Sequence, residues 1–216
     1  MRQIPIDILS INLDIPFVPP RTKQAAKLDE FATWLCDGEQ GLGLRHDQVR
    51  LRTWDELFGY EVVAQFFGDN GLITRTADRI KLAIRNARTA ADWEIVRRVL
   101  VRFYTHMNFP PRSTTIFSAN THSRFASADE LDAYFRQFWQ PHMSSRPALF
   151  SYVKIADWEA DIRLLVEKSN ALPDALFVAW DTQFTHVQDW ESFVGSLPTV
   201  MENSAHLFDL AFSPMQ

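Results

Sequence analysis

The sequence predicts an α+β protein in which antiparallel sheet packs against helices, and three features support this class. Short segments that alternate between apolar and polar residues are numerous, as expected of strands with one buried face. Each half of the chain also contains stretches with apolar residues at helical spacing. The order strand, helix, strands, helix occurs in residues 1–108 and again in residues 109–216. We therefore expect an internal duplication, with two halves that share one pseudo-symmetric core and a seam near residues 108–113.

The first half opens with an alternating segment, residues 4–17, that predicts a strand. Its alternation slips once, which indicates a bulge, and the turn VPPRT ends it. Residues 23–36 place Phe31 and Trp34 at helical spacing. Residues 37–47 are rich in Gly and Asp and predict a loop.

Four strands and a helix complete the first half. The strands are predicted at residues 49–54, 60–67, 71–77 and 79–86. GDNG at 68–71 predicts a tight hairpin turn, because Asn-Gly readily adopts the positive φ that such a turn requires. In residues 92–107 an apolar stripe that begins at Trp93 predicts a helix.

The same order returns after the segment NFPPRS, residues 108–113. Residues 114–125 predict a strand, and residues 127–139 predict a helix in which Ser127 and Glu130 have the spacing of a capping box. Three more strands are predicted at residues 148–156, 160–168 and 174–184, although 160–168 fits a short helix nearly as well. The last block, residues 189–212, is predicted to be helical.

The composition is that of a soluble, densely packed protein, with 46% hydrophobic and 23% charged residues. No stretch approaches the ~20 apolar residues that a membrane helix needs. The N-terminus lacks the apolar core and cleavage site of a signal peptide. The single cysteine, Cys36, excludes an internal disulfide and suits a reducing compartment. We expect a cytoplasmic protein that does not enter a membrane.

Charge is unevenly distributed along the chain, whose net charge is −5. Residues 1–108 carry 15 Lys and Arg against 14 Asp and Glu, whereas residues 109–216 carry 7 against 13. The negative balance disfavours nucleic acid as a general partner. Residues 75–102 nevertheless hold eight basic and three acidic residues.

This basic stretch supplies the candidate binding residues. On a strand, Arg79, Lys81 and Arg85 share one face and leave the other face to Ile and Leu side chains. Such a ladder suits an acidic protein partner or a phosphate backbone. The alternative is a solvated face that acids on neighbouring strands neutralise. The candidate binding residues are Arg79, Lys81, Arg85, Arg97, Arg98 and Arg102.

No pattern typical of a catalytic or metal site is present. The six histidines lack the HxH and HxxxH spacings that bring two imidazoles to one metal. GSLP at 195–198 lacks the Gly-x-Ser-x-Gly elbow, and Cys36 is interpreted as core filler. GEQGLGLRHD at 38–47 follows a helix and has no GK[ST], so we interpret it as a flexible connector or lid. We predict no catalytic residue, no metal and no cofactor.

The tripeptide Asp-Trp-Glu occurs three times, at residues 92–94, 157–159 and 189–191. Before the first copy, Thr89 stands three residues ahead of Asp92, the spacing at which each side chain bonds the other's backbone N–H at a helix start. We interpret the copies as helix starts or turns, and not as a binding signature.

The run EVVAQFF…RFYTHM, residues 61–107, resembles an uncharacterised, sporadically distributed family of bacterial proteins. In that family a strand hairpin leads through a short link with an aromatic residue into a long helix. The C-terminal helix of the family ends in a Phe-containing segment similar to SAHLFDLAF at 204–212, whereas TIFSANTHSRF at 115–125 departs from the family pattern. The resemblance implies a bacterial intracellular protein and assigns it no activity.

Three functional hypotheses from different classes follow. The first is a non-catalytic interaction protein of the bacterial cytoplasm, such as an immunity, antitoxin-like or defence-associated module, that binds another and possibly acidic protein. The second is a small-ligand binder with an aromatic cavity, which the 17 Phe and seven Trp permit. The third is an enzyme acting on nucleotides or nucleic acid through Asn120, His122 and nearby carboxylates.

Overall fold

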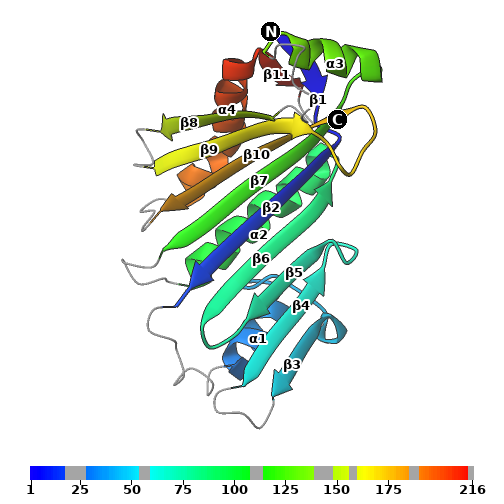
Figure 1. Cartoon of the computed structure of the whole chain (residues 1–216). Coiled ribbons are helices and arrows are strands. Elements are labelled where there is room, and N and C mark those ends of the chain that lie inside the picture. The colour runs from blue at the N-terminus through cyan, green and yellow to red at the C-terminus, as the bar shows by residue number, and fades with distance from the viewer. Residues whose placement is uncertain are drawn as a thin grey trace.

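The computed structural model describes residues 1–17, 28–53, 59–107, 114–138, 148–155, 160–184 and 190–213. In this part of the chain, strands and four α-helices confirm the predicted α+β class (Figure 1). The nine strands of the main, antiparallel sheet are β2 (Ile8–Pro16), β3 (Val49–Thr53), β4 (Tyr60–Phe66), β5 (Gly71–Arg75), β6 (Arg79–Ala87), β7 (Thr115–Arg124), β8 (Ala148–Ile155), β9 (Ala160–Lys168) and β10 (Ala175–Phe184). The helices are α1 (Leu28–Cys36), α2 (Ala90–Met107), α3 (Ala128–Arg136) and α4 (Trp190–Ala205).

The two central strands of the sheet come from different halves of the chain. β2 and β7 are antiparallel neighbours, with Ile11 opposite Ala119. From this pair the order runs β2-β6-β5-β4-β3 on one side and β7-β10-β9-β8 on the other. In each half, the first strand that enters the sheet therefore lies beside the last strand of the same half: β2 beside β6, and β7 beside β10. The predicted order of elements agrees with this topology, while duplication of one unit stays a prediction.

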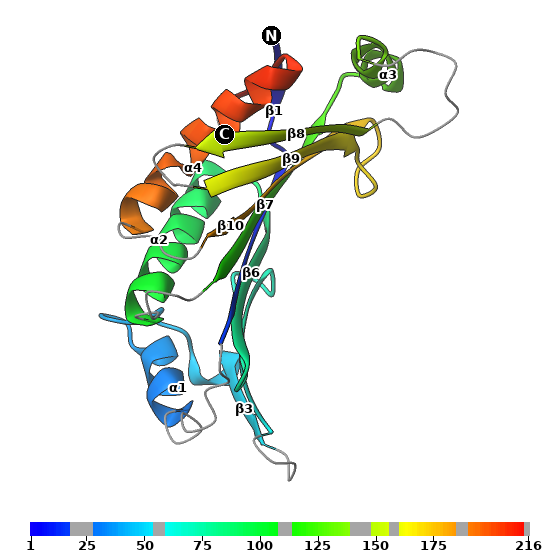
Figure 2. The ribbon, with the colours of Figure 1, turned by 60° about the vertical axis from the view of Figure 1, so that its left-hand side comes forward.

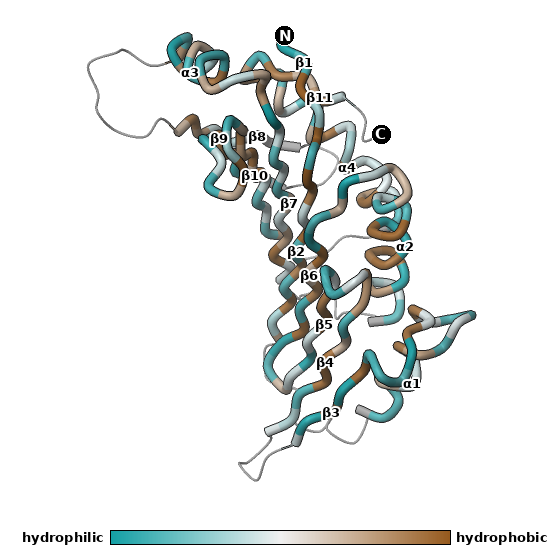
Figure 3. The backbone as a smooth tube through the Cα atoms, turned by 90° about the vertical axis from the view of Figure 1, so that its right-hand side faces the viewer, coloured by the Kyte–Doolittle hydropathy of each residue, from teal (hydrophilic) through white to brown (hydrophobic). Residues whose placement is uncertain are grey.

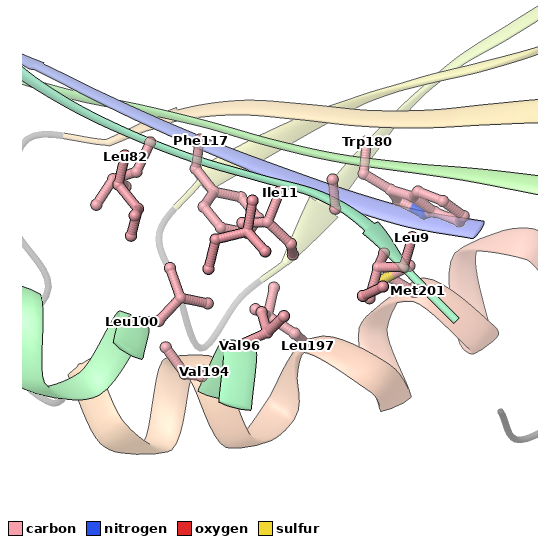
Figure 4. Packing of buried hydrophobic residues seen from close by; sticks show 14 of the residues in the cluster. Leu9, Ile11, Leu82, Val96, Leu100, Phe117, Trp180, Val194, Leu197 and Met201 are labelled. Carbon is pink, nitrogen blue, oxygen red and sulfur yellow. The ribbon is translucent and has the colours of Figure 1, made fainter. Parts of the chain in front are cut away.

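Helices α1, α2 and α4 lie on the same face of the sheet (Figure 2). The buried positions of the strands alternate with exposed or half-buried ones, so each strand turns one row of side chains toward these helices. Figure 4 shows this contact, where the sheet and the two long helices meet through Leu9, Ile11, Leu82, Phe117, Trp180, Val96, Leu100, Val194, Leu197 and Met201. Burial of these apolar side chains is the main source of stability.

Helix α3 lies apart from the other helices, at the end of the sheet near the N-terminus (Figure 3). Ser127 caps it by accepting a hydrogen bond from the Glu130 N–H at 3.2 Å, as predicted. Its buried Tyr134 hydroxyl donates to the Phe208 carbonyl at 3.0 Å. Burial raises the pKa of Tyr134 above its ordinary value, so this hydroxyl keeps its proton as a structural donor.

Both chain ends differ from the prediction. The expected strand 4–17 is two strands, β1 (Arg2–Pro5) and β2, and β1 pairs in parallel with β11 (Leu210–Ser213). The block 189–212 is therefore helical only in part: α4 and a short 3-10 helix, His206–Phe208, precede β11. Asp209 stops the helical path with a left-handed φ of 57°. Pairing with β1, some 200 residues away, explains why a local pattern did not reveal β11.

Two ambiguities of the sequence are resolved by strand pairing. Residues 160–168 form a strand because β8 and β10 hydrogen-bond to its two edges. The predicted bulge lies in the partner strand: the three residues Leu9–Ile11 of β2 face the four residues Ile84–Ala87 of β6, where Asn86 has a φ of 57°. The predicted turn at 18–22 and the seam at 108–113 lie outside the described residues.

Candidate functional site

The face of the sheet turned away from α1, α2 and α4 is the main candidate surface, and we call it the open face. No described helix runs along its length (Figures 1 and 2). Because directly opposite residues in an antiparallel pair point to the same side, the printed registers assign each strand's outward row. In β6 this row contains Arg79, Lys81 and Arg85, since Ile80, Leu82 and Ile84 are buried. The predicted basic ladder is therefore confirmed as a row on one side of β6.

The part of the open face built by β2 to β6 is basic, and we call it the basic half. Register continues the row from Lys81 through Thr74 and Val63 to Arg50 on the edge strand β3. Arg52 follows two residues later. The outward charged residues of these strands are five basic and two acidic ones, namely Arg50, Arg52, Arg79, Lys81, Arg85, Asp14 and Glu61.

Acidic side chains neutralise part of this basic half. Asp14 on β2 forms ion pairs with Arg79 at 3.5 Å and Lys81 at 3.4 Å, which is the cross-strand neutralisation that the sequence left open. Glu61 lies 3.6 Å from Arg52. Within the described residues, neither Arg50 nor Arg85 has an ion pair. Arg50 and Arg85 are exposed and are thus the two cations best placed to meet an external anion.

The other three candidate residues lie on α2, on the opposite side of the sheet. Arg97 pairs with Glu94 of its own helix at 3.2 Å, and Arg102 donates to the Gly41 carbonyl at 2.6 Å. Arg98 is exposed beside a surface hollow of about 310 Å³ that Glu191 also lines. The structure therefore does not bring the six predicted residues together into one site.

Asn120 and His122, the candidates for an enzymatic role, lie on β7 in the centre of the open face. The Ser169 hydroxyl accepts the N–H groups of Ala171 and Leu172, and it lies 2.9 Å from His122 Nδ1. Because its lone pairs serve those two amides, this hydroxyl donates its proton to Nδ1. Burial lowers the pKa of His122, so the ring is neutral at pH 7. This hydrogen bond holds the turn between β9 and β10.

The rest of the open face is less basic and more apolar. The outward residues of β7, β9 and β10 include Asp161, Glu167 and Asp181 against Arg124 and Arg163. Arg163 is bonded to Asp181 at 2.5 Å. Three large apolar side chains are exposed in this part, Ile116 (45%), Phe150 (50%) and Tyr152 (71%), and a fourth, Leu72 (37%), is exposed on β5 in the basic half.

A pocket of about 270 Å³ lies on the helical side of the sheet, between α2, α4 and the chain ends. The apolar residues that line this pocket include Leu9, Trp93, Met201 and Phe212, and Glu202 contributes a carboxylate. Trp93 belongs to the first Asp-Trp-Glu copy. It is half-buried, so one residue serves both the helix start and this pocket.

The first Asp-Trp-Glu copy begins α2 as predicted. The Thr89 hydroxyl accepts the Asp92 N–H at 3.1 Å, and the Asp92 carboxylate accepts the Thr89 N–H at 3.0 Å. The second copy lies outside the described residues, and of the third only Trp190 and Glu191 are described, at the start of α4.

The predicted flexible connector or lid at 38–47 is anchored at several points. Asp37 accepts the N–H groups of Glu39 and Gln40, and the Trp34 indole donates to the Gln40 carbonyl at 3.1 Å. These bonds pack the loop onto the end of α1. At that end Cys36 is half-buried and lies outside the buried core, so it is not the core filler that the sequence predicted; burial raises the pKa of its thiol, which favours the protonated form.

Within the described ranges, no three His, Cys, Asp or Glu side chains are close enough together to hold a metal ion. No helix in the same ranges has the length and apolarity needed to span a bilayer.

No family model matches the chain, and no curated protein matches it. Sequence reasoning missed Arg50 and Arg52, although the alternation in VRLRT contains the signal, because only strand pairing brings them next to β6.

Proposed function

We propose that this chain is a non-catalytic binding protein that docks another protein on the open face of its sheet. The observation that carries the proposal is the one-sided helical cover of a nine-stranded sheet. Its outward side combines two cations, Arg50 and Arg85, that have no ion pair among the described residues with exposed apolar side chains such as Leu72 and Ile116. Large exposed apolar groups rimmed by polar residues are typical of protein-binding surfaces.

The basic half suggests that the partner presents acidic side chains. The basic half carries five outward basic residues and two acidic ones, so it attracts an acidic surface of a partner over a long range. Flanking apolar residues favour a protein over a nucleic acid, as does the net charge of −5. We place this binding activity in the bacterial cytoplasm, where the chain would act as an immunity, antitoxin-like or defence-associated module that controls the protein it binds.

Charge reversal tests the proposal. In the double variant Arg50→Glu/Arg85→Glu both unpaired cations become anions, so capture of the partner from a lysate of the source organism weakens at least about tenfold at low salt. The matched control, Arg88→Glu/Arg136→Glu, has the same charge change outside the open face and keeps its partner. Both pairs are exposed, so thermal unfolding temperatures stay close to that of the wild type.

Two results would reject the proposal. One is equal loss of capture by both double variants, which would indicate a nonspecific charge effect. The other is loss of the captured material on nuclease treatment, which would identify a nucleic acid as the partner. Quantitative mass spectrometry of the three eluates separates these cases.

A second candidate function is binding of a small apolar ligand in the pocket beside Trp93. Its volume of about 270 Å³ lies just below the roughly 300–1,000 Å³ typical of ligand sites, which ranks this function second. Native mass spectrometry of the purified protein tests it, because a bound ligand adds mass that the denatured chain lacks.

A further inference from the structure

The two edges of the nine-stranded sheet are built differently. β3, at one edge, is five residues long and carries Arg50 and Arg52. Charged residues and short length are the means by which proteins prevent edge-to-edge pairing. β8, at the other edge, is eight residues long and reads ALFSYVKI, with Lys154 as its single charged position. Among the described residues, such protection is therefore found at the β3 edge and not at the β8 edge.

The β8 edge also exposes aromatic side chains. Phe150 and Tyr152 stand on the open face with exposed fractions of 50% and 71%. Their rings touch edge to face, with centroids 5.0 Å apart and planes at 84°. One edge of β8 pairs with β9 from Ala148 to Ile155, and no described strand pairs with its other edge. The edge of β8 away from β9 therefore presents a row of backbone N–H and C=O groups next to the exposed rings of Phe150 and Tyr152.

We propose that β8 pairs antiparallel with β8 of a second copy, which joins the two sheets in a two-fold symmetric dimer. Centring the two-fold axis at Ser151 places Phe150 of each copy opposite Tyr152 of the other. Aromatic pairs in this position stabilise antiparallel strands. The charged position Lys154 then falls opposite Ala148, so no like charges face each other.

The residues next to the edge also tolerate a second copy. Arg163 of β9 lies opposite Tyr152, and it is the nearest outward cation whose side chain is described. Asp181 neutralises it at 2.5 Å, so two copies approach without an uncompensated charge at this position. Two identical edges complete each other, as an isologous interface requires.

Sedimentation of the full chain tests the dimer. The weight-average mass rises from 25.0 kDa toward twice that value as concentration increases from about 1 to about 100 µM, since an edge contact is small and weak. Phe150→Lys/Tyr152→Lys keeps the monomer mass throughout, because lysines protect an edge. Leu72→Lys, an apolar-to-lysine change on the same face away from the edge, dimerises like the wild type.

Three outcomes overturn the proposal: a monomeric wild type, a dimer that survives the β8 changes, or a dimer that Leu72→Lys also abolishes. Hydrogen exchange of the wild type provides a measurement free of folding artefacts. Exchange of the β8 amides slows as concentration rises, while exchange of β3 does not change. Concentration-independent exchange of β8 also overturns the proposal. The inference does not depend on the proposed function, which variants of β3 and β6 test separately.

Discussion

Thr89 and Asp92 close the first turn of α2 by exchanging hydrogen bonds at 3.0 and 3.1 Å. Asp92 also accepts the Arg88 N–H at 2.9 Å, so one carboxylate satisfies two backbone donors. These N–H groups have no partner within the helix. A residue pair visible in the sequence therefore performs the same task in the structure.

Removing the Thr89 hydroxyl tests this cap. Thr89→Ala lowers the free energy of unfolding by about 1 kcal/mol, the usual effect of losing an N-cap hydroxyl. Thr89→Ser keeps the acceptor and stays within about 0.5 kcal/mol of the wild type. Urea unfolding measures both values. Equal stability of the three proteins would show that the cap contributes nothing.

The Asp92 carboxylate makes the stability of α2 depend on pH. Hydrogen bonds from the Arg88 and Thr89 backbone lower the pKa of Asp92 below its ordinary value. Because the pKa of Asp92 is lower in the folded than in the unfolded protein, its contribution to folding stability is complete above the unfolded pKa of about 3.9. This contribution is lost as the pH falls through the folded pKa. The stability difference between the wild type and Asp92→Asn, measured by urea unfolding, therefore shrinks below about pH 4. A difference that stays constant down to pH 3 would contradict this assignment.

The loop at 37–45 shows how an element can depend on one glycine. A Cβ atom on Gly41 would lie 1.6 Å from the Trp34 carbonyl oxygen, inside the backbone at the end of α1. The Gly41 carbonyl also accepts the Arg102 guanidinium of α2 at 2.6 Å. Close contact with α1 thus positions the loop to bond α2.

Substitution of Gly41 tests this contact. Gly41→Ala forces the loop away from α1 and lowers the free energy of unfolding by about 2–4 kcal/mol. Gly38→Ala is the matched control in the same loop, because its Cβ meets nothing within 4 Å. Its stability stays within about 0.5 kcal/mol of the wild type. Denaturation curves for the two variants that coincide would refute the close approach.

Sequence patterns located most of the strands and helices, because each depends on local periodicity. The hairpin turn of β4 and β5, the capped start of α3 and the alternation of β6 all appear where predicted. β11 was missed because the strand with which it pairs, β1, is some 200 residues away in the sequence. The ladder on β6 was predicted, and its neutralisation by acids on neighbouring strands was kept as the alternative. Strand pairing identifies Asp14 as one such acid and extends the basic row to Arg50.

At the scale of the whole molecule, the central pair of β2 and β7 joins the two halves of the chain. Ile11 and Phe117, one on each strand, are both buried in the shared core. A half on its own would expose a long central strand and the apolar row beneath it. The halves are therefore expected to depend on each other for folding.

Separate expression of residues 1–108 and 109–216 tests this dependence. Each fragment alone lacks a cooperative unfolding transition, and mixing the two restores one because the β2–β7 pair reforms. Circular dichroism of the fragments and the mixture follows the transition. A cooperative transition in either fragment alone would show that the halves are independent domains.

The sequence alone determined the α+β class, the position of most elements and which side of β6 is basic, since these follow from periods of two and 3.6 residues along the chain. Only the tertiary structure decided that β2 adjoins β7, that Arg50 and Arg85 share an open face, and that β8 ends the sheet with its aromatic pair. The physical reason is that a strand's pattern records which side is buried, whereas its neighbours are selected by packing over the whole sheet.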